Sequence, residues 1–159
     1  MRVRRWRPGE EADLFEVYHS AIHQVASRDY SAEQIDAWAP RDLDTALWAA
    51  HIRRIDPFVV ALAGDVVAYA DLQANGYIDH FFVSGAHPGR GLGTVLMEHI
   101  LGEARLRDLP ELTSDVSRTA RGFFERFGFR VVEQREPVLR GVVIPNARMR
   151  LALRDDAAR

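Results

Sequence analysis

The sequence contains no cysteine and no lysine. Without cysteine the chain has no disulfide, no thiolate nucleophile and no thiolate ligand for a metal. Its 21 lysine-or-arginine positions are all arginine, so it has neither a phosphate-loop lysine nor a kinase-type lysine, and it cannot form a Schiff base. These two absences remove several large enzyme classes before any motif is considered.

A surplus of positive charge and long apolar runs are also missing. The 159 residues carry a net charge of −2, so no overall basic field points to nucleic acid. The apolar runs are too short to cross a bilayer, and the charged N-terminus lacks the apolar region of a signal peptide. We therefore expect a cytoplasmic protein that binds neither nucleic acid nor membranes. A single domain should span 1–153, with a frayed polar tail over 154–159.

The hydrophobic pattern predicts a mixed α/β (α+β) fold. Helices are expected near 10–26, 31–38, 43–53, 91–107 and 118–127. Strands are expected at 2–7, 58–62, 66–70, 77–83, 112–116, 129–132 and 147–151. Turn residues at 64–65 and 75–76 would join the second, third and fourth strands as an antiparallel meander. The helix after the fourth strand would form a right-handed crossover to a parallel fifth strand.

Three glycines, Gly89, Gly91 and Gly93, lie between strand 77–83 and the best predicted helix. Without Cβ atoms nearby, successive N–H groups can turn toward one anion, and a helix N-terminus adds positive charge. Arg90 adds a full charge, so the loop predicts a pyrophosphate site; the alternative is a glycine-rich turn with no ligand. The dinucleotide spacing of glycines is absent and a Walker loop needs lysine, which leaves coenzyme A.

These residues resemble the GNAT family of acetyl-CoA-dependent N-acyltransferases, and above all its YafP-type bacterial branch. The stretch 88–93 is similar to the family's phosphate-loop pattern, and 115–129 is similar to its helix ending in Phe-Tyr/Phe-Glu-x-x-Gly-Phe. Segments 30–40 and 140–149 also match, so the resemblance covers nearly the whole chain. It implies the GNAT-type fold, with a mixed and mostly antiparallel sheet flanked by helices.

The resemblance also implies a reaction and the residues that bind the cofactor. It implies acetyl transfer from acetyl-CoA to a primary amine of a small molecule or protein by direct attack, without a metal, in an enzyme that is a possible homodimer. The sheet would splay apart to admit the pantetheine arm. The implied cofactor-binding residues are Phe82, Val83, Ser84, Gly89, Arg90, Gly91, Leu92, Gly93, Thr94, Ser117, Ala120 and Phe123.

Two residues depart from the family pattern. Pro88 occupies the family's Gln/Arg position and has no N–H to donate, which should weaken phosphate binding. Phe124 stands where many relatives carry a tyrosine that protonates the leaving thiolate, and phenylalanine cannot donate a proton. The alternative function is therefore a CoA-binding GNAT-like module with weak or no catalysis.

Asp79 and His80 are the predicted catalytic residues, because either could accept a proton from the amine beside the expected thioester. Alternation along a strand predicts that only one of them faces the cleft. Their alternative roles are a hairpin cap and a half-buried sheet residue. A backbone N–H near Val83 should polarise the thioester carbonyl.

The resemblance assigns the acceptor site to the variable early helices. The implied substrate-binding residues are His23, Tyr30 and Trp38. His19 and His23 share one helix face, but the H-E-x-x-H pattern of a zinc helix is absent. We therefore expect a solvated or substrate-facing helix surface there.

Overall fold

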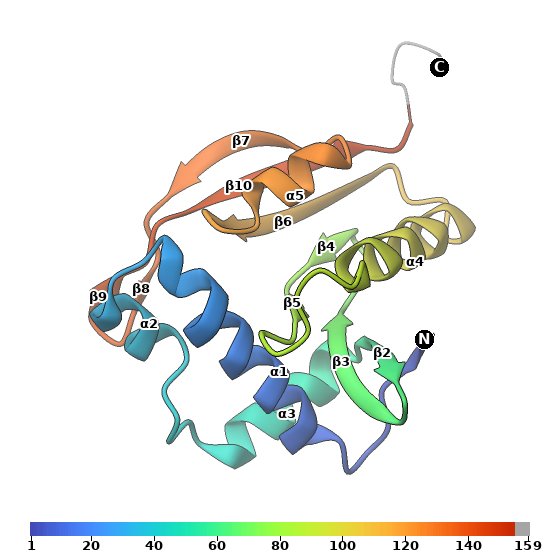
Figure 1. The fold of residues 1–159 in the computed structure, drawn as a ribbon. Coiled ribbons are helices and arrows are strands. Elements are labelled where there is room, and N and C mark those ends of the chain that lie inside the picture. Colours follow the sequence, from blue (N-terminus) through green and yellow to red (C-terminus); the bar gives the residue numbers. More distant parts are fainter. Residues whose placement is uncertain (155–159) are drawn as a thin grey trace.

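The computed structural model describes residues 1–154, which fold into two four-stranded sheets, one two-stranded sheet and the helices that pack against them (Figure 1). The helical elements are α1 (Glu11–Ser20), η1 (Ala21–Val25), η2 (Ala26–Arg28), α2 (Ala32–Trp38), α3 (Thr45–Ile55), α4 (Leu92–Leu106) and α5 (Arg121–Arg126). The strands are β1 (Arg2–Arg5), β2 (Phe58–Leu62), β3 (Asp65–Ala70), β4 (Tyr77–Ile78), β5 (Phe81–Val83), β6 (Glu111–Ser117), β7 (Arg130–Arg135), β8 (Val138–Leu139), β9 (Val142–Val143) and β10 (Asn146–Ala152).

The two sheets have the orders β1-β2-β3-β5 and β4-β6-β10-β7. Strands β2 and β3 are antiparallel, as predicted. Strand β4 pairs in parallel with β6, which confirms the crossover through α4. The predicted continuous strand 77–83 is wrong, because it is split into β4 and β5, which pair with different sheets. Only β5 completes the predicted meander.

The split in the strand is held by a buried carboxylate. Asp71 is fully buried, and its Oδ1 accepts hydrogen bonds from the backbone N–H groups of Asp79 at 2.9 Å and His80 at 2.7 Å. The N–H of Asp71 donates in turn to the carbonyl of His80 at 3.2 Å. These bonds draw the two residues out of the line of β4 and toward β3, so the chain changes sheets there.

Two hydrophobic clusters lie on opposite faces of this frame. Helix α4 packs its apolar stripe on the first, which includes Leu96, Met97 and Ile100. The second cluster is formed with α1, α2 and α3 and includes Trp48 and Tyr69. The neighbouring residues His80 and Phe82 contact rings of this second cluster, at Tyr18 and Tyr69. His80 and Phe82 therefore face α1, whereas α4 covers the opposite face of this sheet.

Local signals explain several elements and miss others. Ser31 and Gln34 form the predicted capping box at α2. The predicted helix 10–26 has its first part as α1 but continues as the π-helix η1 and the 3₁₀ turn η2. The hairpin of β8 and β9 was not predicted. Most of the predicted tail 154–159 lies outside the described residues.

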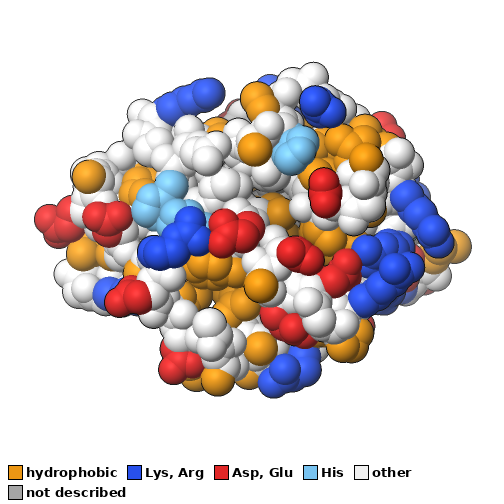
Figure 2. Space-filling view, turned by 60° about the horizontal axis from the view of Figure 1, so that its bottom comes forward, with side chains coloured by type: hydrophobic (Ala, Val, Ile, Leu, Met, Phe, Trp, Pro, Cys, Tyr) orange, Lys and Arg blue, Asp and Glu red, His pale blue; other side chains and the backbone are white. Residues whose placement is uncertain are grey.

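The described surface carries both signs of charge. Acidic and arginine side chains alternate across the face seen in Figure 2, with apolar and histidine side chains between them. Within residues 1–154, no helix combines the length and the apolar character that crossing a membrane requires.

Candidate active site

Among residues 1–154, β5 is the edge strand of its sheet and pairs only with β3. Ser84 donates its N–H to Val67, and His80 accepts at its carbonyl from Asp71, so these positions of the β5 segment face β3. In an antiparallel ladder the residues between such positions turn their N–H and C=O the other way. Phe81 and Val83 therefore direct their backbone groups toward the side from which β6 has separated.

The glycine loop leads into the N-terminus of α4. Gly89 and Gly91 both have φ of +70°, a region that glycine adopts without steric cost. Gly91 is the N-cap, and no side chain of the described residues caps the helix there. Because the first N–H groups of a helix lack intrahelical acceptors, those of 92–94 are available to an anion. Leu92 can contribute only its backbone, since its side chain is buried in the core.

A first cavity of about 300 Å³ runs between the loop, η1 and the start of α5. Gly93 allows the ring of Phe123 to approach, because a Cβ there would lie 3.1 Å from that ring. Pro88 also lines this cavity. The predicted cofactor-binding residues that line it are Phe82, Val83, Ser84, Gly93, Ser117, Ala120 and Phe123. Gly89, Arg90, Gly91, Leu92 and Thr94 lie outside its lining, in the loop and at the start of α4.

A second cavity of about 330 Å³ lies on the other side of Phe82. Asp79, His80, Tyr30 and Trp38 line it, so it contains most of the residues predicted for catalysis and acceptor binding. The two cavities share three lining residues, which are Trp38, Phe82 and Ser117. A group bound in the first cavity can therefore meet a group bound in the second.

Asp79 and His80 both line the second cavity, so the prediction that only one faces the cleft is wrong. Strict alternation requires an extended strand, and neither residue belongs to one, because β4 ends at Ile78 and β5 begins at Phe81. The buried Asp71 described above fixes this bend. No motif predicts these hydrogen bonds between residues eight and nine positions apart.

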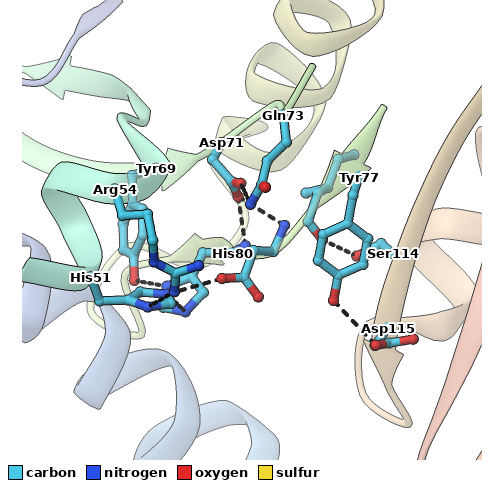
Figure 3. A network of polar contacts seen from close by, with 11 residues as sticks. His51, Arg54, Tyr69, Asp71, Gln73, Tyr77, His80, Ser114 and Asp115 are labelled. Carbon is cyan, nitrogen blue, oxygen red and sulfur yellow. Dashed lines mark hydrogen bonds and ion pairs between the residues drawn. The ribbon is translucent and has the colours of Figure 1, made fainter. Parts of the chain in front are cut away.

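A polar chain that the sequence did not reveal surrounds these two residues (Figure 3). Arg54 Nη2 lies 2.6 Å from His51 Nδ1, and His51 Nε2 lies 2.9 Å from Asp79 Oδ2. Arginine can only donate, so His51 Nδ1 accepts and its Nε2 carries the proton that is donated to Asp79. His80 contacts Tyr69 Oη through Nδ1 at 3.0 Å, and its ring stacks on Tyr18 with centroids 5.5 Å apart.

The surroundings give Asp79 and His80 different charge states. Burial lowers the pKa of His80 to about 4, although the carboxylate of Asp79 acts in the opposite direction. Burial alone would raise the pKa of Asp79, but the hydrogen bond from His51 and nearby positive charge outweigh it and bring that pKa below its usual value. At neutral pH the second cavity thus contains a neutral imidazole beside an ionised carboxylate.

The same cluster has the composition of a metal site. Ligand atoms of His51, Asp79 and His80 all lie within 4.8 Å of one another. However, Arg54 requires His51 Nε2 to be protonated, and a metal-binding nitrogen must be free of its proton. The observed contacts therefore favour a hydrogen-bonded chain from Arg54 through His51 to Asp79 over a metal centre.

The other predicted residues do not belong to the polar chain around Asp79 and His80. His23 lines neither cavity; its Nε2 lies 2.7 Å from the carbonyl of Ala39, and its ring stacks on His19. His19 is in contact with Arg41, so the helix face there is polar and partly solvated. Phe124 is almost fully buried among other phenylalanine rings and presents no proton donor.

Comparison with known proteins agrees with this architecture. Residues 26–152 match the Acetyltransferase (GNAT) domain. The chain is 31% identical over 150 residues to the uncharacterized N-acetyltransferase YafP of Escherichia coli (strain K12), an alignment that covers 94% of this chain and 95% of YafP. A GCN5-related N-acetyltransferase from Rhodopseudomonas palustris has a TM-score of 0.90 and 29% identity, with coverage of 96% and 95%. YncA of Salmonella typhimurium, solved with acetyl-CoA, has a TM-score of 0.69 and 22% identity, with coverage of 100% and 97%.

The fold is therefore that of an acyl-CoA-dependent N-acetyltransferase. The chain belongs to the GNAT acetyltransferase family. This confirms the predicted fold class and enzyme class. The acceptor, the reaction path and the roles of single residues remain predictions.

Proposed function

We propose that the protein transfers an acetyl group from acetyl-CoA to a primary amine by direct attack. The observation that carries this proposal is the meeting of the two cavities at Phe82 and Ser117, beside the open edge of β5. One cavity adjoins an anion-binding helix start, and the other contains a carboxylate. Such a pair of sites suits a phosphorylated acyl donor and a cationic acceptor.

The donor would occupy the first cavity. The backbone groups of Phe81 and Val83 would pair with the amides of the pantetheine arm, and the N–H groups at the start of α4 would bind the pyrophosphate. The acetyl-CoA in the YncA structure supports this choice of donor. The N–H of Val83 would also polarise the thioester carbonyl, where negative charge develops during attack.

The acceptor would occupy the second cavity, where Asp79 would bind its ammonium group. The ammonium would first release one proton to solvent, and the resulting neutral amine would attack the carbonyl carbon, so that a C–N bond forms and the C–S bond breaks. The nitrogen becomes strongly acidic as its bond to carbon forms, so a carboxylate of low pKa can accept its proton. We assign this step to Asp79. His80 would be a neutral neighbour that positions His51, because its Nε2 lies 3.2 Å from His51 Nε2 and its Nδ1 lies 3.0 Å from Tyr69 Oη.

The departing thiolate would meet Ser117 and water. The Oγ of Ser117 accepts a hydrogen bond from the N–H of Ala120 at 3.1 Å, which leaves its own proton free to be donated. Phe124 cannot fill this role. The presence of Phe124 in place of a tyrosine also supports the alternative function, a CoA-binding module with weak or no catalysis.

Equilibrium binding of acetyl-CoA and thiol release with a panel of primary amines test the proposal together. Saturable binding and amine-dependent thiol release are the expected results. Saturable binding without release from any amine would favour the binding module. Absence of binding at millimolar acetyl-CoA would overturn both functions.

A further inference from the structure

The second cavity has a wall of contiguous aromatic rings. Tyr30 and Trp38 meet edge to face with centroids 5.5 Å apart, and Trp38 meets Phe82 at 6.5 Å. Phe82 in turn meets Tyr18 at 4.9 Å, again edge to face. These four rings come from three separate segments of the chain, so the wall is a product of the fold. Faces of aromatic rings bind other flat rings and also attract cations.

The polar groups of the second cavity favour a cation and disfavour an anion. Its described lining contains two carboxylates, Asp79 and Asp115, and no arginine. Asp115 is already bonded by Arg135 at 3.1 Å, Arg148 at 3.0 Å and Tyr77 at 3.1 Å. Asp79 receives a hydrogen bond from His51 but no direct bond from an arginine of residues 1–154. Asp79 is therefore the carboxylate that can engage an ammonium group.

The remaining lining of the second cavity carries no positive charge. Leu139 of the β8–β9 hairpin, Pro137 and Ile144 are apolar, and Tyr77, Ser117 and Asn146 are polar but neutral. A carboxylate on the acceptor would therefore face neutral side chains or the two aspartates, without a positively charged partner in this lining. The volume of about 330 Å³ lies in the range that encloses a small molecule. Flat rings pack against aromatic faces with specific geometry that an unbranched alkyl chain cannot adopt.

We propose that the acceptor is a small primary amine attached to a flat, uncharged ring system and lacking a carboxylate. This inference rests on the proposed acetyl transfer and adds the class of acceptor. In the bound state the ring would lie against Trp38 and Phe82, and the ammonium group would lie at Asp79. The amine and the thioester would then meet where the two cavities join.

Three probe amines separate the effect of the ring from the effect of a carboxylate on turnover. Phenethylamine has the ring and the amine, phenylalanine adds a carboxylate, and butylamine lacks the ring. Thiol release from acetyl-CoA should give phenethylamine a kcat/KM at least about tenfold above each of the others, since either a like charge or a lost ring contact is worth that much. A peptide with a single lysine serves as the competing macromolecular acceptor.

Adding a positive charge to the β8–β9 hairpin gives a second test, which has a matched control. Leu139 lines the second cavity, whereas its neighbour Val138 is 61% exposed and does not. Leu139→Arg should lower kcat/KM for phenethylamine about tenfold and raise it for phenylalanine, because an arginine would then face the carboxylate. Val138→Arg adds the same charge to the same hairpin and should change neither value.

The outcomes distinguish this inference from the proposed function. Equal or better turnover of butylamine, phenylalanine or the lysine peptide by the wild-type enzyme would overturn the acceptor class and leave acetyl transfer standing. Acetyl-CoA binding without turnover of any of the four would also overturn it. Loss of acetyl-CoA binding itself would instead refute the proposed function. Equal effects of the two arginine variants would show that Leu139 does not contact the acceptor.

Discussion

Asp71 is a buried carboxylate whose ionisation should oppose folding at neutral pH. Burial raises its pKa from the ordinary value of 3.8 to about 6, in spite of the hydrogen bonds from the backbone of His80 and the side chain of Gln73. One pKa unit corresponds to about 1.4 kcal/mol. The difference between the folded and unfolded pKa of Asp71 therefore corresponds to about 3 kcal/mol.

The sign of this effect follows from where the proton binds. Between pH 3.8 and about 6 the folded protein holds a proton on Asp71 that the unfolded chain has already released. The contribution of Asp71 to the free energy of unfolding is therefore fully present below pH 3.8 and is lost as the pH rises through about 6. Other groups superimpose their own pH dependence, so the effect must be isolated by comparison with a variant.

Asp71→Asn provides that comparison. The amide oxygen can still accept from the N–H groups of Asp79 and His80, and the half-buried amide of Gln73 can rotate to present its oxygen. Free energies of unfolding from urea titrations should be measured for both proteins between about pH 4 and pH 7.5. The variant's stability relative to wild type should rise with pH by up to about 3 kcal/mol. Parallel curves for the two proteins would refute the reasoning.

The catalytic rate gives a second test of the role of Asp71. Asp71→Asn keeps the acceptor and should retain most of kcat, whereas Asp71→Ala removes it and leaves two backbone N–H groups without a partner. A displacement of about 1 Å at reacting groups can lower a rate about 100-fold. A rate for Asp71→Ala equal to that of Asp71→Asn would show that the bend does not depend on this acceptor.

Three further predictions concern the two cavities. Asp79→Asn should lower kcat/KM for the amine by about 100-fold or more and His80→Gln by less; unchanged pH–rate profiles in both variants would remove the proposed roles. Gly91→Ala, at φ +70°, should cost about 1–2 kcal/mol and weaken acetyl-CoA binding in calorimetry. Its control, Gly102→Ala, lies inside α4 with open space around the added Cβ and should instead stabilise the fold by about 0.5–1 kcal/mol with unchanged affinity. Dialysis against EDTA should leave the rate unchanged, and a loss that Zn²⁺ restores would show that His51, Asp79 and His80 bind a metal.

The elements that the sequence predicted well are those with strong local signals. The apolar stripe and the glycines located α4, and the capping box located α2. The parallel pairing of β4 with β6 followed from the crossover rule. These features depend on residues close together in the chain, or on topology that the order of elements already limits.

What the sequence did not predict depends on contacts between distant residues. Periodicity favours a continuous strand over 77–83, and only the side chain of Asp71 breaks it. His51 and Arg54 lie on α3 with no motif around them. His51 contacts Asp79, and Arg54 contacts His51, only because α3 packs beside that bend. The motifs that resemble the family mark the glycine loop and the α5 region, whereas Tyr77 and Leu139 of the second cavity belong to no motif.

The bend at Asp79 and His80 would connect the proposed cofactor site with the proposed acceptor site. If the strand ran straight, its residues would stay paired with β6, and the backbone of Phe81 and Val83 would not be free for a cofactor. Asp79 and His80 would then also lie on opposite faces of the sheet. A single carboxylate therefore supports both halves of the site, so removing it should raise KM for acetyl-CoA and lower kcat together. Asp79→Asn, which leaves the bend intact, should affect the amine alone.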